Sequence, residues 1–165
     1  GYSLFGVCTQ LVISTKKETN LYQINKNNKF SFIKKLEKMP QKSTSYSINQ
    51  GYTKLWTCEK IKKFIDIQME QGLSLRFVGS MVADIHRAII KGGSFLYPGN
   101  KKNKKGKLRL LYEVMPMAYI FENLGGVAIN DQDIRILDLK FPKNIHEKSS
   151  LILLNQHDFK IYKMF

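Results

Sequence analysis

Apolar and polar positions along the chain follow two different periods, which predict strands and helices. Short apolar runs bounded by turn residues predict strands at residues 2–15, 20–24, 30–33, 46–48, 94–97, 127–129, 134–137 and 151–154. Apolar residues at helical spacing predict helices over residues 55–69, 81–90 and 108–124, and glycines follow each of them. Because strands and helices alternate through the middle of the chain, we expect one α/β domain with a mixed β-sheet flanked by helices.

Three local signals refine this pattern. The polar stretch from Asn25 to Asn28 separates two short strands and predicts a hairpin turn. Asn155 is placed to cap a last helix. Pro116 falls inside the third helical stretch, where it removes a backbone hydrogen bond, so it either kinks that helix or marks the start of a new one.

The charge of the chain is strongly positive but unusually poor in arginine. The formal net charge is +14, and the 27 basic residues comprise 23 lysines and 4 arginines. Proteins that read nucleic acids rely on arginine for bidentate contacts, so dedicated nucleic-acid binding is disfavoured. A lysine excess with many Ile and Asn residues is typical of an AT-rich genome, and a general preference for anionic partners is the second explanation.

The sequence lacks the motifs of two further kinds of site, a zinc site and a nucleotide-binding loop. Cys8 and Cys58 lie fifty positions apart with no Cys/His cluster, which disfavours a zinc site and fits two free thiols in a reducing compartment. The chain contains neither G-x-G-x-x-G nor G-x-x-x-x-G-K-[ST], so a nucleotide phosphate loop has no support.

The most informative stretch runs from a predicted strand through a basic loop into a predicted helix. Ligands bind at such strand ends in open α/β sheets, and helix N-termini favour anions. Lys107 at the helix start and Tyr97 before the loop therefore form a candidate phosphate clamp. The alternative is a solvated loop, which we expect for Lys101, Lys102, Lys104 and Lys105 and which remains open for Lys107.

Other polar residues have two interpretations each. Glu113 lies on an otherwise apolar helix face and needs a partner, which is either a divalent cation or a salt bridge. Arg109 is either structural or anion-binding. Asp84 is expected to be a salt-bridge partner or a cap rather than a catalyst. The three histidines share no spacing and are expected to be structural or surface residues: His86, His146 and His157.

Several segments resemble class I fructose-1,6-bisphosphatase in the same order along the chain: 1–6, 46–52, 76–87, 95–98, 106–113, 116–119 and 125–126. The resemblance implies that residues 1–165 are the C-terminal half of the sugar-phosphatase fold. It also implies a cytoplasmic enzyme of gluconeogenesis that hydrolyses the 1-phosphate of fructose 1,6-bisphosphate to give fructose 6-phosphate, using Mg²⁺ or Mn²⁺. The implied partners are the sugar phosphate, an N-terminal half and further copies in a dimer of dimers, without nucleic acid or membrane.

The same resemblance implies roles for individual residues. Glu113 is the implied metal ligand next to the 1-phosphate and hence the catalytic residue. Arg76 is implied to reach the 6-phosphate of a neighbouring subunit, and Met81 to pack against the sugar. The residues implied to hold the 6-phosphate and sugar are Asn49, Tyr52, Tyr97 and Lys107.

The sequence departs from the family in two respects. Phe77 stands where the family has Tyr beside the arginine, and a lost hydrogen bond to a charged group costs about 1.5–3 kcal/mol. The acidic D-P-x-D-G-S-S-N motif of the family's N-terminal half is not in this sequence, so we expect the chain by itself to be inactive, as a cut, partial or decayed form. The alternatives are a sedoheptulose-1,7-bisphosphatase and a non-catalytic basic remnant that binds sugar phosphate or polyanions.

Overall fold

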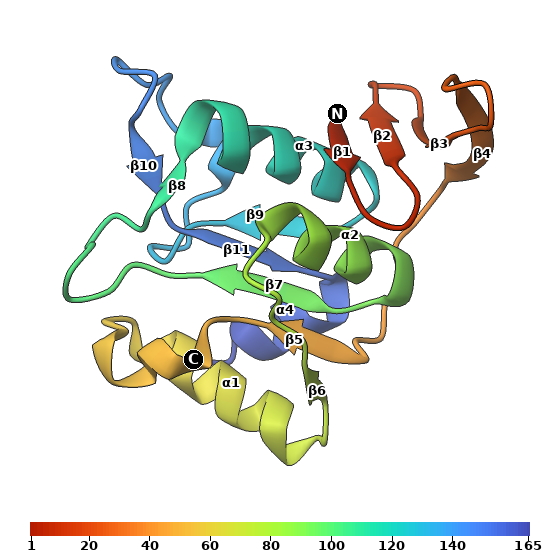
Figure 1. The fold of residues 1–165 in the computed structure, drawn as a ribbon. Helices are drawn as coiled ribbons and strands as arrows, with labels where there is room; N and C mark the ends of the chain where they lie inside the picture. The colour runs from red at the N-terminus through yellow and green to blue at the C-terminus, as the bar shows by residue number, and fades with distance from the viewer.

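A computed structural model describes all residues from Gly1 to Phe165. Its centre is a five-stranded sheet with the strand order β6-β5-β7-β11-β9 (Figure 1). The strands are β5 (Ser45–Ser47), β6 (Ser74–Leu75), β7 (Ser94–Tyr97), β9 (Val127–Ile129) and β11 (Leu151–Leu154). β5 pairs in parallel with β6 and β7, whereas β11 pairs antiparallel with β7 and β9. The mixed sheet predicted from the sequence is therefore confirmed.

Helices cover both faces of this sheet. α2 and α3 lie on one face, and α1 and α4 lie on the other (Figure 1). Their bounds are α1 (Glu59–Glu70), α2 (Met81–Lys91), α3 (Met115–Asn123) and α4 (Gln156–Tyr162). No helix combines the length and the hydrophobicity that a membrane crossing requires.

The central strand β11 shows why this sheet needs two helical layers. All four of its residues are buried, and successive side chains of a strand point to opposite faces. Leu151 and Leu153 join the core under α2 and α3, whereas Ile152 and Leu154 join the core under α1 and α4. A continuous apolar run is what a strand covered on both faces requires.

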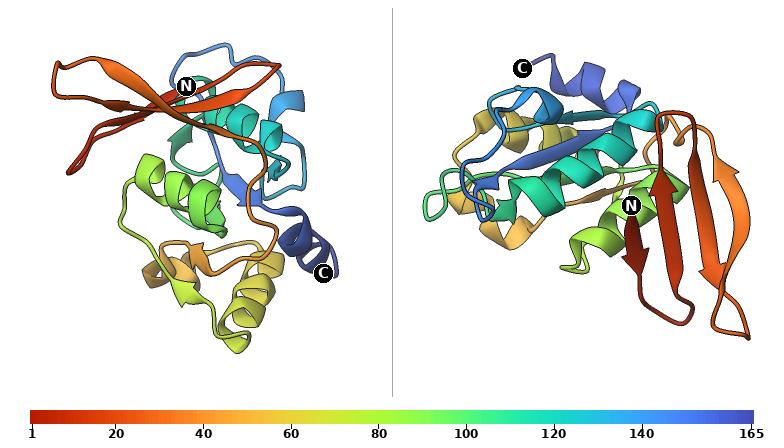
Figure 2. Two further views of the ribbon diagram at one scale, coloured as in Figure 1. Left: turned by 90° about the vertical axis from the view of Figure 1, so that its right-hand side faces the viewer. Right: turned by 90° about the horizontal axis from the view of Figure 1, so that it is seen from above.

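A second sheet projects from the side of the molecule (Figure 2). It contains four antiparallel strands in sequence order: β1 (Tyr2–Leu4), β2 (Gln10–Ser14), β3 (Thr19–Ile24) and β4 (Phe30–Leu36). Its inner face packs against α2 and α3 through Tyr2, Val12 and Leu21. Tyr2 also forms a hydrogen bond of 2.9 Å with Nδ1 of His86 on α2.

The outer face of this second sheet is also apolar, and it is uncovered. The strand register aligns Leu11, Tyr22 and Phe32 in one cross-strand row. Phe32 is 58% exposed and Phe30 is 45% exposed. We call the set Leu11, Ile13, Tyr22, Ile24, Phe30 and Phe32 the outer apolar face.

The structure corrects two strand predictions. Residues 2–15 form β1 and β2 joined by an exposed loop instead of one strand, because polar and turn-forming residues around Gly6 interrupt the apolar run. Residues 134–137 were predicted as a strand, but Arg135 forms only a single β-bridge, with Ile129, because the backbone turns into a 3₁₀ helix, η3, at Ile136–Asp138. A tight turn precedes this bridge, in which Oδ1 of Asn130 accepts hydrogen bonds from the N–H groups of Gln132 and Ile134.

The predicted helix 108–124 begins later than expected. Leu108–Arg109 form a short strand, β8, that pairs with β10 (Lys148–Ser149), and a π-helical turn, η2, follows at Leu110–Val114. α3 starts at Met115, with Pro116 in its first turn, so the prediction that Pro116 marks a new helix start is confirmed. Lys107 therefore precedes a strand, not a helix.

Two predicted local features agree with the structure, and the start of the first helix differs. The hairpin turn after β3 and the cap at Asn155 are confirmed, since Oδ1 of Asn155 accepts the N–H of Asp158 at 2.8 Å. The first helix starts at Glu59, because Leu55 belongs to a preceding 3₁₀ helix, η1 (Gln50–Leu55). Cys8 and Cys58 are both free thiols.

Candidate functional site

Three of the sequence-predicted residues emerge from one edge of the central sheet. β5, β6 and β7 run in parallel, so their carboxyl ends meet at the same edge. Asn49 follows β5, Arg76 follows β6, and Tyr97 is the last residue of β7. In open α/β sheets this edge is where ligands bind.

Asn49, Tyr52 and Tyr97 line one small hollow at this edge. Asn49 precedes η1, and the N–H of Tyr52 donates to its carbonyl oxygen at 3.1 Å. The ring of Tyr97 stacks on Phe95, with ring centroids 6.5 Å apart and planes inclined by 22°. The phenol rings of Tyr52 and Tyr97 and the amide of Asn49 therefore contribute to the polar lining of the hollow.

The basic loop after β7 folds back onto η1 and brings Lys107 to the hollow. The N–H of Lys101 donates to the carbonyl oxygen of Leu55 at 2.9 Å, and Trp56 forms a β-bridge with Asn100. The ammonium group of Lys107 lies 5.7 Å from the ring centroid of Tyr52, within cation–π range. The other loop lysines, 101, 102, 104 and 105, are exposed, as expected for a solvated loop.

Gly106 makes this placement of Lys107 possible. Its φ of +85° lies in the left-handed region that favours glycine. A Cβ atom there would lie 2.7 Å from the carbonyl oxygen of Ser149, and this backbone atom could move away only if β10 shifted. The glycine thus permits the close approach of the loop to β10 immediately before Lys107.

Arg76 and Met81 lie apart from the hollow. The side chain of Arg76 is exposed, and its only hydrogen bond is Nη1 to the carbonyl oxygen of Leu75 at 3.3 Å. Met81 is the first residue of α2 and packs, half-buried, against the core beneath α2 and α3. The structure thus brings Asn49, Tyr52, Tyr97 and Lys107 together but places neither Arg76 nor Met81 in the lining of the same hollow.

Glu113 lies in the π-helical turn and is half-buried. It forms no salt bridge, contrary to one of the two sequence interpretations, and its Oε2 accepts the N–H of Arg109 at 2.5 Å. No group of three His, Cys, Asp or Glu side chains in the chain is arranged to hold a metal ion. Mg²⁺ takes about six oxygen ligands and is usually held by one or two carboxylates together with waters and phosphate oxygens, so Glu113 could supply one ligand and the rest would have to come from elsewhere.

Comparison with known proteins decides the family. The sequence profile described as "Fructose-1-6-bisphosphatase, C-terminal domain" matches residues 39–165. The chain belongs to this family. The resemblance stated from the sequence is thereby confirmed.

Individual members of the family match beyond that profile. A fructose-1,6-bisphosphatase of Schizosaccharomyces pombe is 43% identical over 171 residues, covering 100% of this chain and 48% of that protein. A class 1 fructose-1,6-bisphosphatase of Sulfurihydrogenibium is 38% identical, covering 99% of this chain and 50% of that protein. The crystal structure of Leishmania major fructose-1,6-bisphosphatase in apo form superposes with a TM-score of 0.90 at 31% identity, over 98% of this chain and 52% of that one. The chain thus spans about half the length of the relatives it matches.

The structure adds lining residues that sequence reasoning missed in this family member. Trp56 and Asn100 line the same hollow and are buried. Oδ1 of Asn100 accepts the N–H groups of Lys102 and Asn103, so it shapes the basic loop. The turn sequence Pro98-Gly99 ahead of an asparagine is a signal from which the sequence analysis could have inferred this role.

A buried tyrosine lies beneath this edge. Burial raises the pKa of Tyr46, an effect that its hydrogen bond to Gln50 opposes. The Tyr46 hydroxyl therefore stays protonated at neutral pH and acts as a neutral donor. Tyr46 belongs to the core under α1 and α4, so it supports η1 from below.

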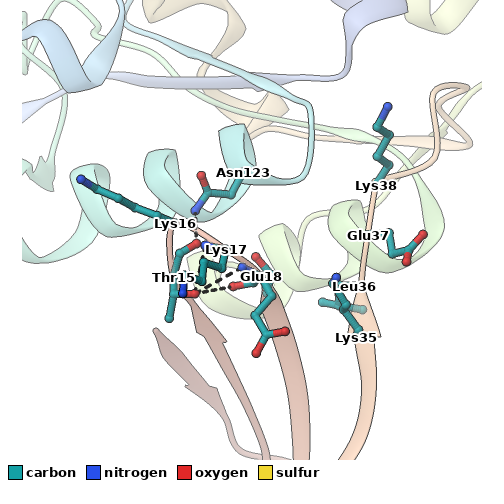
Figure 3. Close-up of a pocket in the computed structure, with 10 residues that line it drawn as sticks. Thr15, Lys16, Lys17, Glu18, Lys35, Leu36, Glu37, Lys38 and Asn123 are labelled. Carbon is teal, nitrogen blue, oxygen red and sulfur yellow. Dashed lines mark hydrogen bonds between the residues drawn. The ribbon is translucent and has the colours of Figure 1, made fainter.

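A cavity larger than this hollow lies elsewhere in this family member. It has a volume of about 640 Å³ and lies between the β2–β3 turn, the end of β4 and Asn123 at the end of α3 (Figure 3). Lysines and glutamates line it, but the ammonium groups of Lys16 and Lys38 point away from each other (Figure 3). Nδ2 of Asn123 is engaged by Ser14 and Thr15. These side chains do not converge on a common ligand position.

Proposed function

We propose that this chain is the sugar-phosphate-binding half of a metal-dependent fructose-1,6-bisphosphatase. The observation that supports it most is that Asn49, Tyr52 and Tyr97 line one hollow at the carboxyl edge of β5 and β7, with the Lys107 ammonium group 5.7 Å from the Tyr52 ring centroid. They form two groups about 45 positions apart in the sequence, Asn49 with Tyr52 and Tyr97 with Lys107, which the fold brings to the same edge. The match of residues 39–165 to the C-terminal domain of fructose-1,6-bisphosphatase also supports this function.

The proposed roles follow from the chemistry of the four side chains. Lys107 supplies a compact positive charge for the 6-phosphate, and contact with the Tyr52 ring restricts where its ammonium group lies. The hydroxyls of Tyr52 and Tyr97 donate to phosphate oxygens, and charge-assisted hydrogen bonds of this type are the strong ones. The Asn49 amide binds a sugar hydroxyl or a phosphate oxygen. Met81 contributes apolar contact to the sugar once the ligand extends past the hollow.

Arg76 is proposed to act on a second copy of the chain. Its guanidinium is exposed and has no carboxylate partner within the same chain. A free guanidinium is suited to a planar, two-point contact with phosphate. This supports an assembly, a dimer of dimers as the resemblance implies, in which Arg76 reaches the 6-phosphate bound by a neighbouring copy.

Glu113 is proposed as one carboxylate ligand of Mg²⁺ or Mn²⁺ beside the 1-phosphate. A metal bound there would neutralise charge on the phosphate. The other ligands must come from outside this chain, since Glu113 has no acidic neighbours grouped with it. The role of this chain is thus to bind and orient the sugar phosphate.

The outer apolar face is proposed to be covered by the amino-terminal half of the protein. The relatives are about twice as long as this chain, and the matching family profile describes a C-terminal domain. β1 is an edge strand of the second sheet, with one side unpaired. An apolar face and an unpaired edge on the same sheet are features that a further domain would cover.

Calorimetric titration with fructose 6-phosphate tests the binding role. The proposal predicts binding that requires the 6-phosphate, so fructose and fructose 1-phosphate should bind at least about tenfold more weakly, which is 1.4 kcal/mol. Lys107→Met should abolish this difference in affinity, whereas Lys101→Met, in the solvated part of the same loop, should keep it.

The same titration separates the two alternative functions. Binding of every polyanion tested, with an affinity that falls steeply as salt rises, would favour the basic remnant instead. A preference for sedoheptulose 7-phosphate would favour the sedoheptulose enzyme.

A further inference from the structure

The segment that joins β6 to α2 has little apolar packing to hold it in place. It contains Arg76, Phe77 and Val78 without regular secondary structure, and Val78 is 64% exposed. Gly79 has a φ of +80°, which turns the chain into α2. Polar contacts must therefore fix the backbone of this segment.

Asp84 on α2 supplies the first of these contacts. Its side chain is 0% exposed, and both carboxylate oxygens accept the N–H of Val78 at 3.2 Å. Oδ1 also accepts Nη2 of Arg87 at 2.6 Å. The expectation that Asp84 is a salt-bridge partner is confirmed, and the same carboxylate also anchors the preceding segment.

Arg87 supplies the second contact. Its Nη2 donates to the carbonyl oxygen of Arg76 at 2.5 Å as well as to Asp84. The N–H of Arg76 in turn donates to the carbonyl oxygen of Tyr46 in β5 at 2.9 Å. Both backbone polar groups of Arg76 are thus fixed, one by the sheet and the other by α2, while its guanidinium remains free of any carboxylate.

We infer that the Asp84–Arg87 ion pair, in which the Asp84 side chain is 0% exposed and that of Arg87 is 26% exposed, is a positioning pair that holds Arg76 in the orientation in which it binds phosphate. Taking the Asp84 carboxylate out of water offsets most of what the pair contributes to stability, so geometry is the better explanation for its presence. Fixing the backbone of a long side chain in advance reduces the entropy lost on binding. The inference rests on the proposed function, because it takes Arg76 as a phosphate-binding residue.

A double-mutant cycle tests this inference in the enzyme assembled from this chain and the amino-terminal half. Arg87→Met should raise KM for fructose 1,6-bisphosphate about tenfold with kcat within about twofold, because only binding geometry is lost. Arg87→Met added to Arg76→Ala should raise KM no further than Arg76→Ala alone. Arg87→Lys should restore part of the loss, since an ammonium group can still donate to both oxygens. A merely structural role would instead give an additive double variant, and that result would overturn the inference.

A second measurement does not depend on activity. In this chain the amide of Val78 should exchange its hydrogen at least about tenfold faster in Arg87→Met and Asp84→Asn, with the amides of β7 and β11 unchanged. Arg135→Met is the matched control, because Arg135 pairs with Glu122 and Asp138 far from this segment and should alter neither KM nor Val78 exchange. Unchanged Val78 exchange in Arg87→Met would contradict the inference. An assembled enzyme without any hydrolysis would contradict the proposed function while leaving the exchange result valid.

Discussion

The two sheets of this chain have similarly apolar strands but very different surroundings. In the five-stranded sheet, helices cover both faces, and every residue of β11 is 0% exposed. In the four-stranded sheet, α2 and α3 cover one face only, and Phe32 on the opposite face is 58% exposed. The first sheet is thus a finished core, covered on both faces, whereas the second sheet leaves one apolar face uncovered in this chain.

The two sheets also differ in the length of an edge strand. In the central sheet the edge strand β6 is only two residues long, which limits unwanted pairing. In the second sheet the edge strand β4 is seven residues long and carries Lys34 and Lys35. Lysines on an edge strand oppose aggregation, and they leave the outer apolar face free to receive a specific partner.

The largest effect is expected from a cavity in the finished core. Leu153→Ala removes a side chain that is 0% exposed beneath α2 and α3. The variant should lose about 2–5 kcal/mol of unfolding free energy, measured by urea denaturation. A loss below about 1 kcal/mol would show that this core is not as tightly packed as the structure describes.

The next effect concerns the ligand rather than the fold. Lys107→Met should weaken fructose 6-phosphate binding by about 1.5–3 kcal/mol, because a charged hydrogen-bond partner is removed. The unfolding free energy should change by less than about 0.5 kcal/mol, since Lys107 is only half-buried and forms no ion pair. Calorimetry and urea denaturation of the same preparation measure the two quantities. Equal losses in both would assign Lys107 a structural role.

A smaller effect on stability is expected from pH, at the contact between β1 of the second sheet and α2. Burial lowers the pKa of His86, whose Nδ1 bonds the Tyr2 hydroxyl of β1. The folded state therefore favours the neutral imidazole, and the associated stability is present above pH 6.5 and is lost as pH falls below it. The melting temperature of the wild-type chain should fall between pH 7.5 and 5.5, and His86→Phe should flatten this dependence. An identical slope in both proteins would exclude His86 as the titrating group.

The smallest effect on folding is expected on the outer apolar face. Phe32→Ser should change the unfolding free energy of the separate chain by less than about 0.5 kcal/mol, because much of this side chain is already in water. The same change should weaken association with the amino-terminal half, measured by analytical ultracentrifugation. Lys26→Ser in the turn after β3 is a control that should leave association unchanged. Equal association of Phe32→Ser and the wild type would show that the outer apolar face is not the interface.

Local sequence patterns predicted the strands of the five-stranded sheet better than those of the four-stranded sheet. β7, β9 and β11 lie where short apolar runs placed them, because strands buried on both faces have continuous apolar sequences. The run 2–15 was wrongly assigned as one strand, although Gly6 and the polar residues that follow it are a local signal for the loop between β1 and β2. The helix 108–124 was started too early, because the pairing of β8 with β10 is a contact between distant residues.

The candidate site was only partly predictable for the same reason. Tyr97 and Lys107 follow from a strand end and a basic loop, which are local signals. The nearness of Lys107 to Tyr52 depends on the loop folding back onto η1 through Lys101 and Leu55, which no local pattern encodes. The contact of Arg87 with the Arg76 carbonyl was missed as well, although the spacing of Asp84 and Arg87 is a recognisable helical ion-pair signal.

The most direct test of the account is phosphate release from fructose 1,6-bisphosphate with Mg²⁺, measured for this chain, for the amino-terminal half and for their mixture. We expect release by the mixture only, because Glu113 is a single carboxylate and the residues proposed to bind the sugar phosphate lie in this chain. Release by this chain without the other half would contradict it. So would a mixture of folded halves that binds fructose 6-phosphate but releases no phosphate.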